Sequence, residues 1–484
     1  MKKTISEFLF GGHLNYALLL KEDIIEKSFI ESYNFLPSIN NDNLVIRPAA
    51  KKICDIVNVG EELAFGYTPS TSDIILFSNS VYFLSSKKKI DDIEDLDARD
   101  VIFYENYIIT KSHIFLYNSF IDHFFKTKIN IEFDDFIHEE NNILKRAIKG
   151  ALKDKYFFSA FKDKLFIFGF IPPAQNYILF SETGDFSNMR CVKKNTENYF
   201  EPGYLVLKSC SSVIDFHCTF SDRLLFFKGR HIYSFFFDTP SILFHKETCH
   251  FIYSSTVKPR SVHNHLFFVS ENNNIIYSCV TEFKNGGLTF LNLMAFTYKY
   301  FYNKKINNIY PFVHPFLGVL AVCDDGEFYI CKIHNSIVSW FKQKASIKLD
   351  KITSNNLGDF YIFSNNVLYN LNLNSIDLNV NFGDFDEAYV VLPHYSTFLD
   401  KIKIQFLKII FENMPADYKL ELIRDNNSIE FNYLPLDFIK SLSVHECRIN
   451  SVLNNCSDFK IRVSLNKDGE KILRPEMIKL EYHD

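Results

Sequence analysis

Short apolar strands separated by polar turns recur along most of the chain. Seven passages repeat one order, in which a turn containing Asp, Asn or Gly leads to an apolar strand, a polar turn and a second apolar strand. The passages are Glu62–Phe65 with Asp73–Leu84, Arg99–Asn106 with Tyr107–Tyr117, Lys162–Gly169 with Asn176–Glu182, Asp222–Lys228 with Arg230–Phe237, Asn264–Ser270 with Asn274–Val280, Leu317–Cys323 with Glu327–Ile333, and Gly358–Ser364 with Asn366–Leu371. They recur about every 40–60 residues, the spacing of propeller blades. The pattern predicts an irregular β-propeller, with an array of β-sandwiches as the rival architecture.

Some of these strands are apolar at every position. Leu224-Leu225-Phe226-Phe227 is one example, and such a run predicts a strand that is buried on both faces, as between two blades. The polar segments Cys323–Glu327 and Glu271–Asn274 have the composition of hairpin turns.

The pattern changes after about Leu392. Ile402–Phe406, Lys460–Leu465 and Met477–Tyr482 alternate apolar and polar residues, which predicts antiparallel strands with one solvent-exposed face. Pro393 is the expected boundary. The sequence therefore predicts three parts: an N-terminal arm over residues 1–50, a propeller over 51–392, and an antiparallel β-sandwich-like domain over 393–484.

Helical patterns are scarce in this sequence. Glu139–Lys153 has apolar residues at helical spacing and predicts a helical insertion within the propeller. Leu18–Asn34 predicts a helical segment in the N-terminal arm, and Leu434–Leu442 is a weaker third candidate. The expected fold class is mainly β.

Composition supports a folded β-rich chain. Hydrophobic residues make up 47% and charged residues 23% of the 484 residues, which excludes a disordered chain. The 52 Phe and 26 Tyr favour strands, because aromatic side chains fit a half-buried pleated surface. The net charge of −5 argues against a protein that grips nucleic-acid backbones, and no apolar run reaches the ~20 residues of a membrane span.

The sequence contains no familiar catalytic or cofactor motif. It has no phosphate-binding glycine loop, no dinucleotide fingerprint and no nucleophile elbow, so we expect a non-enzymatic protein without a cofactor or metal. Two candidate metal sites and one candidate acid–base pair, Asp384 and Asp386 with Glu387, run against this view. A polar connector is the expected role of the acid–base candidate. The acidic run Asp91–Asp97 lacks the Gly of a calcium loop, and His263 with His265 lacks a third metal ligand nearby.

Several motifs occur in an order that resembles a known family. The chain opens with Phe10-Gly11-Gly12, followed by Asp23, Asn34-Phe35 and Arg47-Pro48; later come Tyr177–Phe186, Gly318–Cys323, Asp325-Gly326-Glu327, Val338-Ser339-Trp340 and Leu473–Tyr482. This order resembles the tail-nozzle proteins of short-tailed bacteriophages, the tail tubular protein B-like family. The chain departs from that pattern at Ala49, where the family often has Gly.

The resemblance implies a virion structural protein. It implies a homo-oligomer of six copies that attaches to a tail adaptor protein below the portal, contacts tail fibres or spikes, and forms the channel through which double-stranded DNA leaves. Assembly would take place in the host bacterial cytoplasm. The N-terminal segment and the domain after Pro393 would together face the adaptor, with Gly11, Gly12, Asn34, Arg47 and Pro48 organising that face and Trp340 in the core.

Two other functions are compatible with the same residues. One is a cellular β-propeller that serves as a protein-interaction scaffold. This hypothesis predicts regular blade repeats and a monomeric protein. The other is a glycan-binding or enzymatic propeller, which requires carboxylates or aromatic side chains to converge on one face.

Overall fold

The computed structural model describes the parts of the chain that form strands and their ordered connections. The described residues are 2–5, 31–37, 44–46, 48–55, 63–68, 72–77, 80–83, 88–90, 101–110, 113–118, 123–132, 145–146, 149–150, 156–190, 200–207, 212–238, 241–247, 249–279, 288–294, 304–334, 337–345, 347–349, 351–355, 357–374, 387–391, 395–396, 402–404, 406–412, 418–424, 427–430, 444–449, 453–456, 458–466 and 478–483. They divide into two compact units: unit 1 comprises 1–55, 293–352 and 356–484, and unit 2 comprises 56–292 with 353–355.

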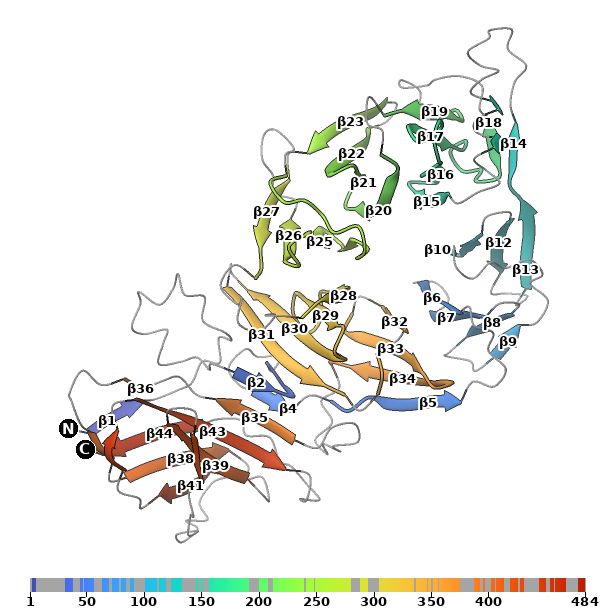
Figure 1. The fold of residues 1–484 in the computed structure, drawn as a ribbon. Helices are drawn as coiled ribbons and strands as arrows, with labels where there is room; N and C mark the ends of the chain where they lie inside the picture. Colours follow the sequence, from blue (N-terminus) through green and yellow to red (C-terminus); the bar gives the residue numbers. More distant parts are fainter. Residues whose placement is uncertain are drawn as a thin grey trace. The chain divides into compact units, whose positions relative to one another are not determined.

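Unit 2 is a series of five antiparallel four-stranded sheets (Figure 1). In chain order they are β6 (Leu63–Thr68), β7 (Ser72–Phe77), β8 (Ser80–Phe83) and β9 (Lys88–Ile90); β10 (Ile102–Tyr104), β11 (Tyr107–Ile109), β12 (His113–Asn118) and β13 (His123–Lys128); β15 (Phe157–Phe161), β16 (Lys164–Phe168), β17 (Tyr177–Phe180) and β19 (Gly203–Val206); β20 (Ile214–Phe220), β21 (Arg223–Lys228), β22 (His231–Asp238) and β23 (Ser241–Glu247); and β24 (Arg260–Val262), β25 (His265–Val269), β26 (Ile275–Cys279) and β27 (Thr289–Asn292). Unit 2 also contains a short parallel pair, β14 (Asn130–Glu132) with β18 (Asn188–Arg190). In sequence, β14 follows β13, and β18 lies between β17 and β19.

Aromatic cores lie between consecutive sheets of unit 2. Strand β21 shows the arrangement, because its alternate residues enter different cores. Leu224 and Phe226 pack with the β15–β19 sheet, whereas Leu225 and Phe227 pack with the β24–β27 sheet. The prediction that this strand is buried on both faces is therefore confirmed. Each large side chain that is removed from water contributes about 1.5–3 kcal/mol, so stacking the sheets is the main source of their stability.

Unit 1 contains most of the remaining residues of this repeating type, while Thr353 and Ser354 at the end of β32 (Lys351–Ser354) belong to unit 2. Strands β32, β33 (Asp359–Ser364) and β34 (Val367–Asn372) form a four-stranded sheet with β5 (Lys51–Asp55), which precedes all the others in sequence. The described residues therefore contain six separate four-stranded antiparallel sheets of this repeating type, the kind of sheet that forms the blades of a β-propeller. A further four-stranded set, β28 (Ile306–Phe312) to β31 (Ile337–Lys344), begins a larger sheet.

That larger sheet has ten strands and joins distant parts of the sequence. Its order runs through β28, β29 (Gly318–Cys323), β30 (Glu327–His334), β31 (Ile337–Lys344), β2 (Glu31–Tyr33), β35 (Glu387–Val391), β43 (Asp458–Asn466), β39 (Tyr418–Arg424) and β40 (Asn427–Glu430), and β36 (Tyr395–Ser396) also pairs with β43. A second sheet pairs β1 (Lys2–Ile5) with β44 (Ile478–His483), followed by β38 (Phe406–Glu412) and β41 (Val444–Ile449). Two short pairs are β3 (Phe35–Pro37) with β4 (Leu44–Ile46) and β37 (Ile402–Ile404) with β42 (Leu453–Cys456).

The predicted strands are confirmed, and the predicted N-terminal helix is corrected. All seven repeated passages form antiparallel hairpins, and the alternating segments after Leu392 form β37, β38, β43 and β44. Most of the described residues of the N-terminal arm lie in strands, and none of them is helical. Glu31–Tyr33, the end of the predicted helix Leu18–Asn34, is β2, because tertiary pairing overrides a helical pattern.

The other two predicted helices fall mainly outside the described residues. Lys145, Arg146, Lys149 and Gly150, which belong to the predicted helix Glu139–Lys153, are helical. Leu434–Leu442 and the first part of Leu18–Asn34 lie outside the described residues.

Candidate functional site

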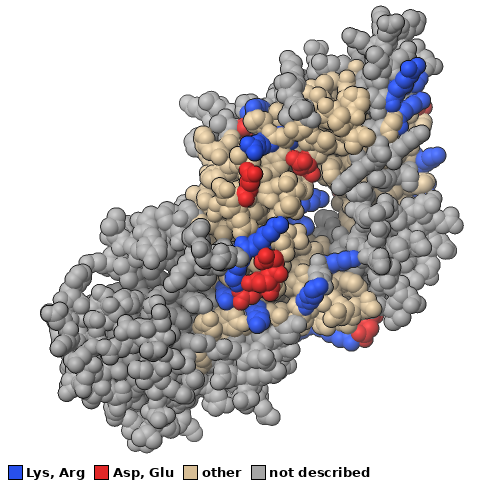
Figure 2. All heavy atoms as spheres, viewed as in Figure 1, with Lys and Arg blue, Asp and Glu red and all other residues tan. Residues whose placement is uncertain are grey.

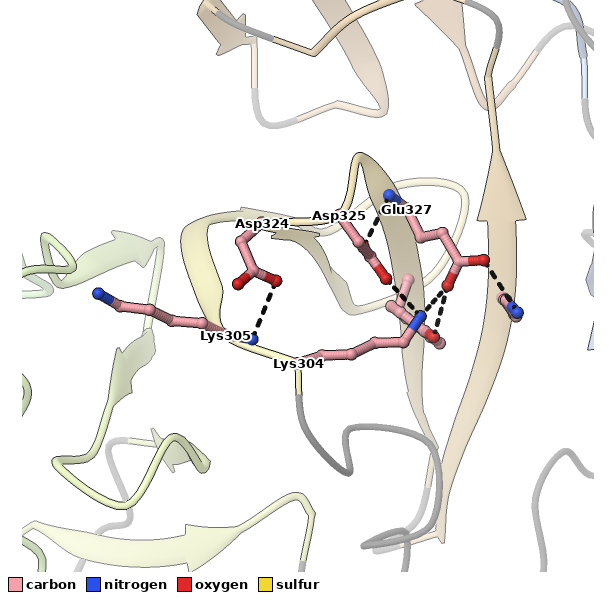
Figure 3. A network of polar contacts seen from close by, with 7 residues as sticks. Lys304, Lys305, Asp324, Asp325 and Glu327 are labelled. Carbon is pink, nitrogen blue, oxygen red and sulfur yellow. Dashed lines mark hydrogen bonds and ion pairs between the residues drawn. The ribbon is translucent and has the colours of Figure 1, made fainter.

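A cluster of charged side chains lies on strands β28–β31 of unit 1, and we call it the charged joint (Figure 3). Lys304 immediately precedes β28, and its Nζ lies 2.7 Å from Asp325 Oδ2 and also contacts Glu327 Oε2. On the other side of the carboxylate, Lys342 Nζ lies 3.0 Å from Glu327 Oε1. The Tyr329 hydroxyl donates to Glu327 Oε2 at 3.2 Å. Glu327 therefore connects Lys304, Tyr329 and Lys342.

The turn between β29 and β30 places both carboxylates of the joint. Gly326 has φ +82°, a conformation that an L side chain rarely adopts, and it allows the tight return from Asp325 to Glu327. The Glu327 backbone N–H donates to Asp325 Oδ1 at 3.0 Å, which fixes the turn. The neighbouring Lys305 N–H donates to Asp324 Oδ1 at 3.2 Å and ties the start of β28 to the same turn.

The joint strongly perturbs its ionisable groups. Burial alone would lower the pKa of Lys304, but hydrogen bonds to Asp325, Glu327 and Tyr329 outweigh it and raise the pKa above its ordinary value. Burial alone would raise the pKa of Asp325 and Glu327, but Lys304 outweighs it at both carboxyls, with Lys342 assisting at Glu327, and their pKa values lie below the ordinary ones. All of these groups are thus held in their charged forms at neutral pH.

The N-terminal strand β2 lies directly beside this cluster. Lys342 Nζ lies 5.5 Å from the centre of the Tyr33 ring, which stacks on Tyr389 of β35 with ring centres 5.0 Å apart. Asn34 follows β2 and is completely buried. Its backbone N–H donates to the Lys342 carbonyl at 3.0 Å, and its side-chain Oδ1 accepts from the Lys344 N–H at 2.9 Å.

The structure places three of the six residues that the sequence singled out. Asn34 binds the backbone of β31, the strand that carries Trp340. Trp340 is 1% exposed, and its indole Nε1–H donates to the Leu293 carbonyl at 3.2 Å. Pro48 is half-buried in the irregular segment before β5. Gly11, Gly12 and Arg47 lie outside the described residues.

Two buried lysines in unit 2 donate hydrogen bonds to groups at the two ends of strand β17. Lys164 Nζ donates to the Ser181 carbonyl at 2.6 Å, just after β17, and to the Glu201 carbonyl at 3.3 Å. Lys228 Nζ reaches the Gln175 carbonyl at 2.9 Å and Asn176 Oδ1 at 2.8 Å, just before β17. The two ammonium groups therefore bracket β17. Burial lowers the pKa of Lys164 to about 8, and Glu182 opposes this only weakly.

One buried ion pair lies in the next sheet. Arg223 Nη1 is 3.4 Å from Glu247 Oε1, and the Arg223 guanidinium lies 4.1 Å from the centre of the Phe236 ring. Glu247, which is 3% exposed, also accepts from the Ser234 hydroxyl and from the Leu288 N–H at 3.2 Å. This carboxylate is saturated by donors from its own unit, which is typical of a structural group.

The two histidines of the candidate metal site, His263 and His265, lie in different environments. His263 is exposed in a turn with φ +49°, whereas the His265 ring stacks on Tyr277 with Nδ1 at 2.9 Å from the Tyr277 hydroxyl oxygen. Burial lowers the pKa of His265, and the neighbouring His263 lowers it further. Among the described residues there is no group of three or more His, Cys, Asp or Glu arranged to hold a metal ion.

Sequence reasoning missed the members of the charged joint other than the turn itself. Glu327 could have been found from its place after the Asp-Gly turn, and Lys342 from its position in the following strand, because a regular hairpin pairs Tyr329 with Lys342. No local signal indicates Lys304, which comes from more than twenty residues upstream of Glu327.

The described surface carries both signs of charge. Figure 2 shows basic and acidic side chains interspersed on this face of the molecule. None of the helices that the structure describes is long and apolar enough to cross a membrane.

Comparison with known proteins identifies no family and finds only distant similarity to solved structures. No family model matches, and no curated protein matches. Among solved structures, the Pan2 WD40 domain of Neurospora crassa is 8% identical, with 67% of this chain and 88% of that chain covered and a TM-score of 0.38. YCF48 bound to D1 peptide is 10% identical over 68% of this chain and 94% of that chain, with a TM-score of 0.38. The extracellular domain of the hybrid two-component system BT4673 from B. thetaiotaomicron is 11% identical over 96% of this chain and 64% of that chain, with a TM-score of 0.41.

Proposed function

We propose that this protein is a non-enzymatic β-propeller scaffold that binds other proteins. The observation that carries the proposal is a row of exposed turns between the first and second strands of three consecutive sheets in unit 2. These turns are Lys162–Asp163, Ser221–Asp222 and His263–Asn264. Polar loops on a rigid core are the usual place for recognition by a scaffold.

The turns are connected and conformationally restricted. The Ser221 N–H donates to the His263 carbonyl at 3.3 Å, and the Asp163 N–H donates to the Tyr104 hydroxyl of the preceding sheet at 3.5 Å. Lys162, Asp163, Ser221 and His263 all have positive φ, between 44° and 58°. Residues other than glycine tolerate this conformation at some cost, so the side chains are presented in fixed directions.

The test is affinity capture with two variants. One is a triple-glycine variant of the unit 2 turns, and the other is a double-glycine control. Asp163→Gly/Asp222→Gly/His263→Gly removes the exposed side chains, and glycine accepts the positive φ of two of these positions without strain. Asn365→Gly/Asn366→Gly is the control, since these turn residues of unit 1 also have positive φ. We expect a partner that forms a complex of defined mass with the wild-type and control proteins and is lost by the triple variant. Retention of every partner by the triple variant would contradict the proposal.

A second candidate function is the phage tail nozzle. The observation that favours it is that both chain ends enter the same sheets of unit 1: β1 pairs with β44, and β2 lies between β31 and β35. A nozzle requires such a combined N- and C-terminal region to face its adaptor. On this proposal the protein acts as a ring of six copies in the virion, with the adaptor, fibres and passing DNA as partners.

Light scattering with negative-stain imaging distinguishes the two proposals. A ring of about six subunits, alone or on the adaptor ring, is expected of a nozzle. A monomer that ignores the adaptor but binds another protein through the unit 2 turns is expected of the scaffold.

A further inference from the structure

The ten-stranded sheet of unit 1 is continuous only through a very short strand. β2 has three residues, and in the sheet order it stands between β31 and β35. It pairs antiparallel with β35 through Glu31, Ser32 and Tyr33, but its parallel pairing with β31 is a single register pair, Tyr33 with Lys342. The contact of β2 with β31 is therefore the weaker of its two sides.

Asn34 extends this weaker side beyond the end of the strand. Its φ of +58° turns the chain out of the strand, and its buried side chain then takes the place of a backbone carbonyl. Together, the N–H and Oδ1 of Asn34 engage the Lys342 carbonyl and the Lys344 N–H, two backbone groups of β31. Asn34 alone thus forms two hydrogen bonds between the end of β2 and the backbone of β31.

Side chains reinforce the same contact. Glu327 of β30 holds Lys342, whose ammonium lies over Tyr33 of β2, and Tyr33 stacks on Tyr389 of β35. This line of contacts crosses four neighbouring strands of the sheet, from β30 to β35. It orients Tyr33, and Asn34 adds backbone-directed hydrogen bonds to β31 after β2 ends.

We propose that Asn34 is a positioning residue that locks β2 onto β31 and thereby couples strands β28–β31 to the C-terminal strands β35, β43, β39 and β40. The coupling does not depend on which of the two proposed functions holds. It makes the N-terminal segment the element that transmits force or displacement between these two parts of the sheet within unit 1. Loss of Asn34 is expected to separate them locally while each part keeps its own pairing.

The test is hydrogen–deuterium exchange of the full chain, read by mass spectrometry with fragmentation that resolves the Lys344 amide. Asn34→Gly keeps the positive φ and removes only the side chain. We expect exchange at Lys344, β2 and the adjacent part of β35 to be about tenfold faster, the usual effect of losing one hydrogen bond. Peptides from unit 2, such as Arg223–Lys228, should exchange at the wild-type rate.

Two further variants separate the lock from general strain. Asn366→Ala places alanine at another Asn with positive φ, in the exposed β33–β34 turn, and is expected to leave Lys344 and β2 unchanged. Asn34→Asp retains an Oδ acceptor and is expected to keep the Lys344 amide protected. Unchanged protection in Asn34→Gly would overturn the proposal. If Asn34→Gly unfolds the whole chain, exchange of the wild type decides: protection of the Lys344 amide supports the lock, and rapid exchange there overturns it.

Discussion

Lys164 in unit 2 and Lys304 in unit 1 both lose much of their hydration, yet their neighbours differ. Lys164 is 0% exposed, and its Nζ donates to the backbone carbonyls of Ser181 and Glu201. Lys304 remains partly exposed and is held by the carboxylates of Asp325 and Glu327. Consequently the pKa of Lys164 is lowered to about 8, whereas the pKa of Lys304 is raised.

The difference shows two uses of a charge in a β-protein. A carbonyl-capped ammonium satisfies backbone acceptors that the sheet cannot pair, and it fixes the ends of β17 at the cost of desolvation. A carboxylate-held ammonium adds Coulomb attraction between strands, and at the charged joint this attraction lies beside β2. The first arrangement supports one sheet, and the second supports a junction between segments that are distant in sequence.

The largest effect is expected from the buried ion pair of unit 2. Glu247→Gln removes the carboxylate that faces Arg223 and leaves a buried guanidinium with only the more distant, exposed Asp222. We expect the free energy of unfolding to fall by about 3–5 kcal/mol, the usual result of breaking a buried pair. Urea unfolding would measure it, with the exposed Glu271→Gln as the control. A loss below about 1 kcal/mol would mean that this pair is as solvated as a surface pair.

A smaller effect is expected from the same substitution at the charged joint. The Glu327 side chain is 18% exposed, and Lys304 keeps Asp325 as a partner when Glu327→Gln is made. We expect a loss of about 1–3 kcal/mol because one partly buried acceptor is weakened. The loss should shrink in high salt, since partly exposed charges are screened. Equal losses for Glu327→Gln and Glu247→Gln would remove the contrast between the two regions.

The pH dependence of stability should have opposite signs in the two regions. Between about pH 8 and 10.5 the unfolded chain keeps the Lys164 proton that the folded chain has released, so this group adds stability as pH rises. The contribution of Lys304 is fully present below pH 10.5, its unfolded pKa, and is lost as pH rises further. Unfolding midpoints of the wild type, Lys164→Met and Lys304→Met across pH 7.5–11 measure both. A wild-type slope that Lys164→Met leaves unaltered between about pH 8 and 10.5 would contradict the assignment to Lys164.

The smallest effects are expected at two hairpin turns. Gly326 has φ +82° with open space around its Cβ position, so Gly326→Ala should cost about 1 kcal/mol through backbone strain alone. Arg230, in the β21–β22 turn of unit 2, has φ +72°, so Arg230→Gly should relieve strain and be neutral or stabilising by less than about 1 kcal/mol. Thermal unfolding measures both. A destabilising Arg230→Gly would show that this guanidinium makes contacts that outweigh its strained backbone.

Local sequence patterns predicted the strands well, because the alternation of side chains that defines a strand is set by neighbouring residues. The run Leu224–Phe227 indicated a strand between two cores, and the structure divides its residues between the neighbouring sheets. Alternation after Leu392 predicted β43 and β44 for the same reason, since successive side chains of a strand point to opposite faces. The helical pattern that ends at Asn34 failed because three residues of it pair with strands far away in sequence.

The candidate site was only partly visible in the sequence. Asn34 and Trp340 were singled out, but nothing in their spacing placed both against β31. Glu327 was recognised as part of a turn, not as the group that holds Lys304 and Lys342. These associations need the register of β28–β31 and the insertion of β2, and a one-residue change of register would turn each side chain to the other face.

The sequence by itself determined that the chain is mainly β, where its hairpins turn and which strands are apolar on both sides. Those properties follow from side-chain alternation and turn chemistry within a few residues. Only the tertiary structure decided that β5 completes the sheet of β32–β34, that β2 joins β31 to β35, and that Lys304 reaches Glu327. Pairing between distant segments depends on which edges remain open after the local hairpins have formed, and no local pattern of residues records that outcome.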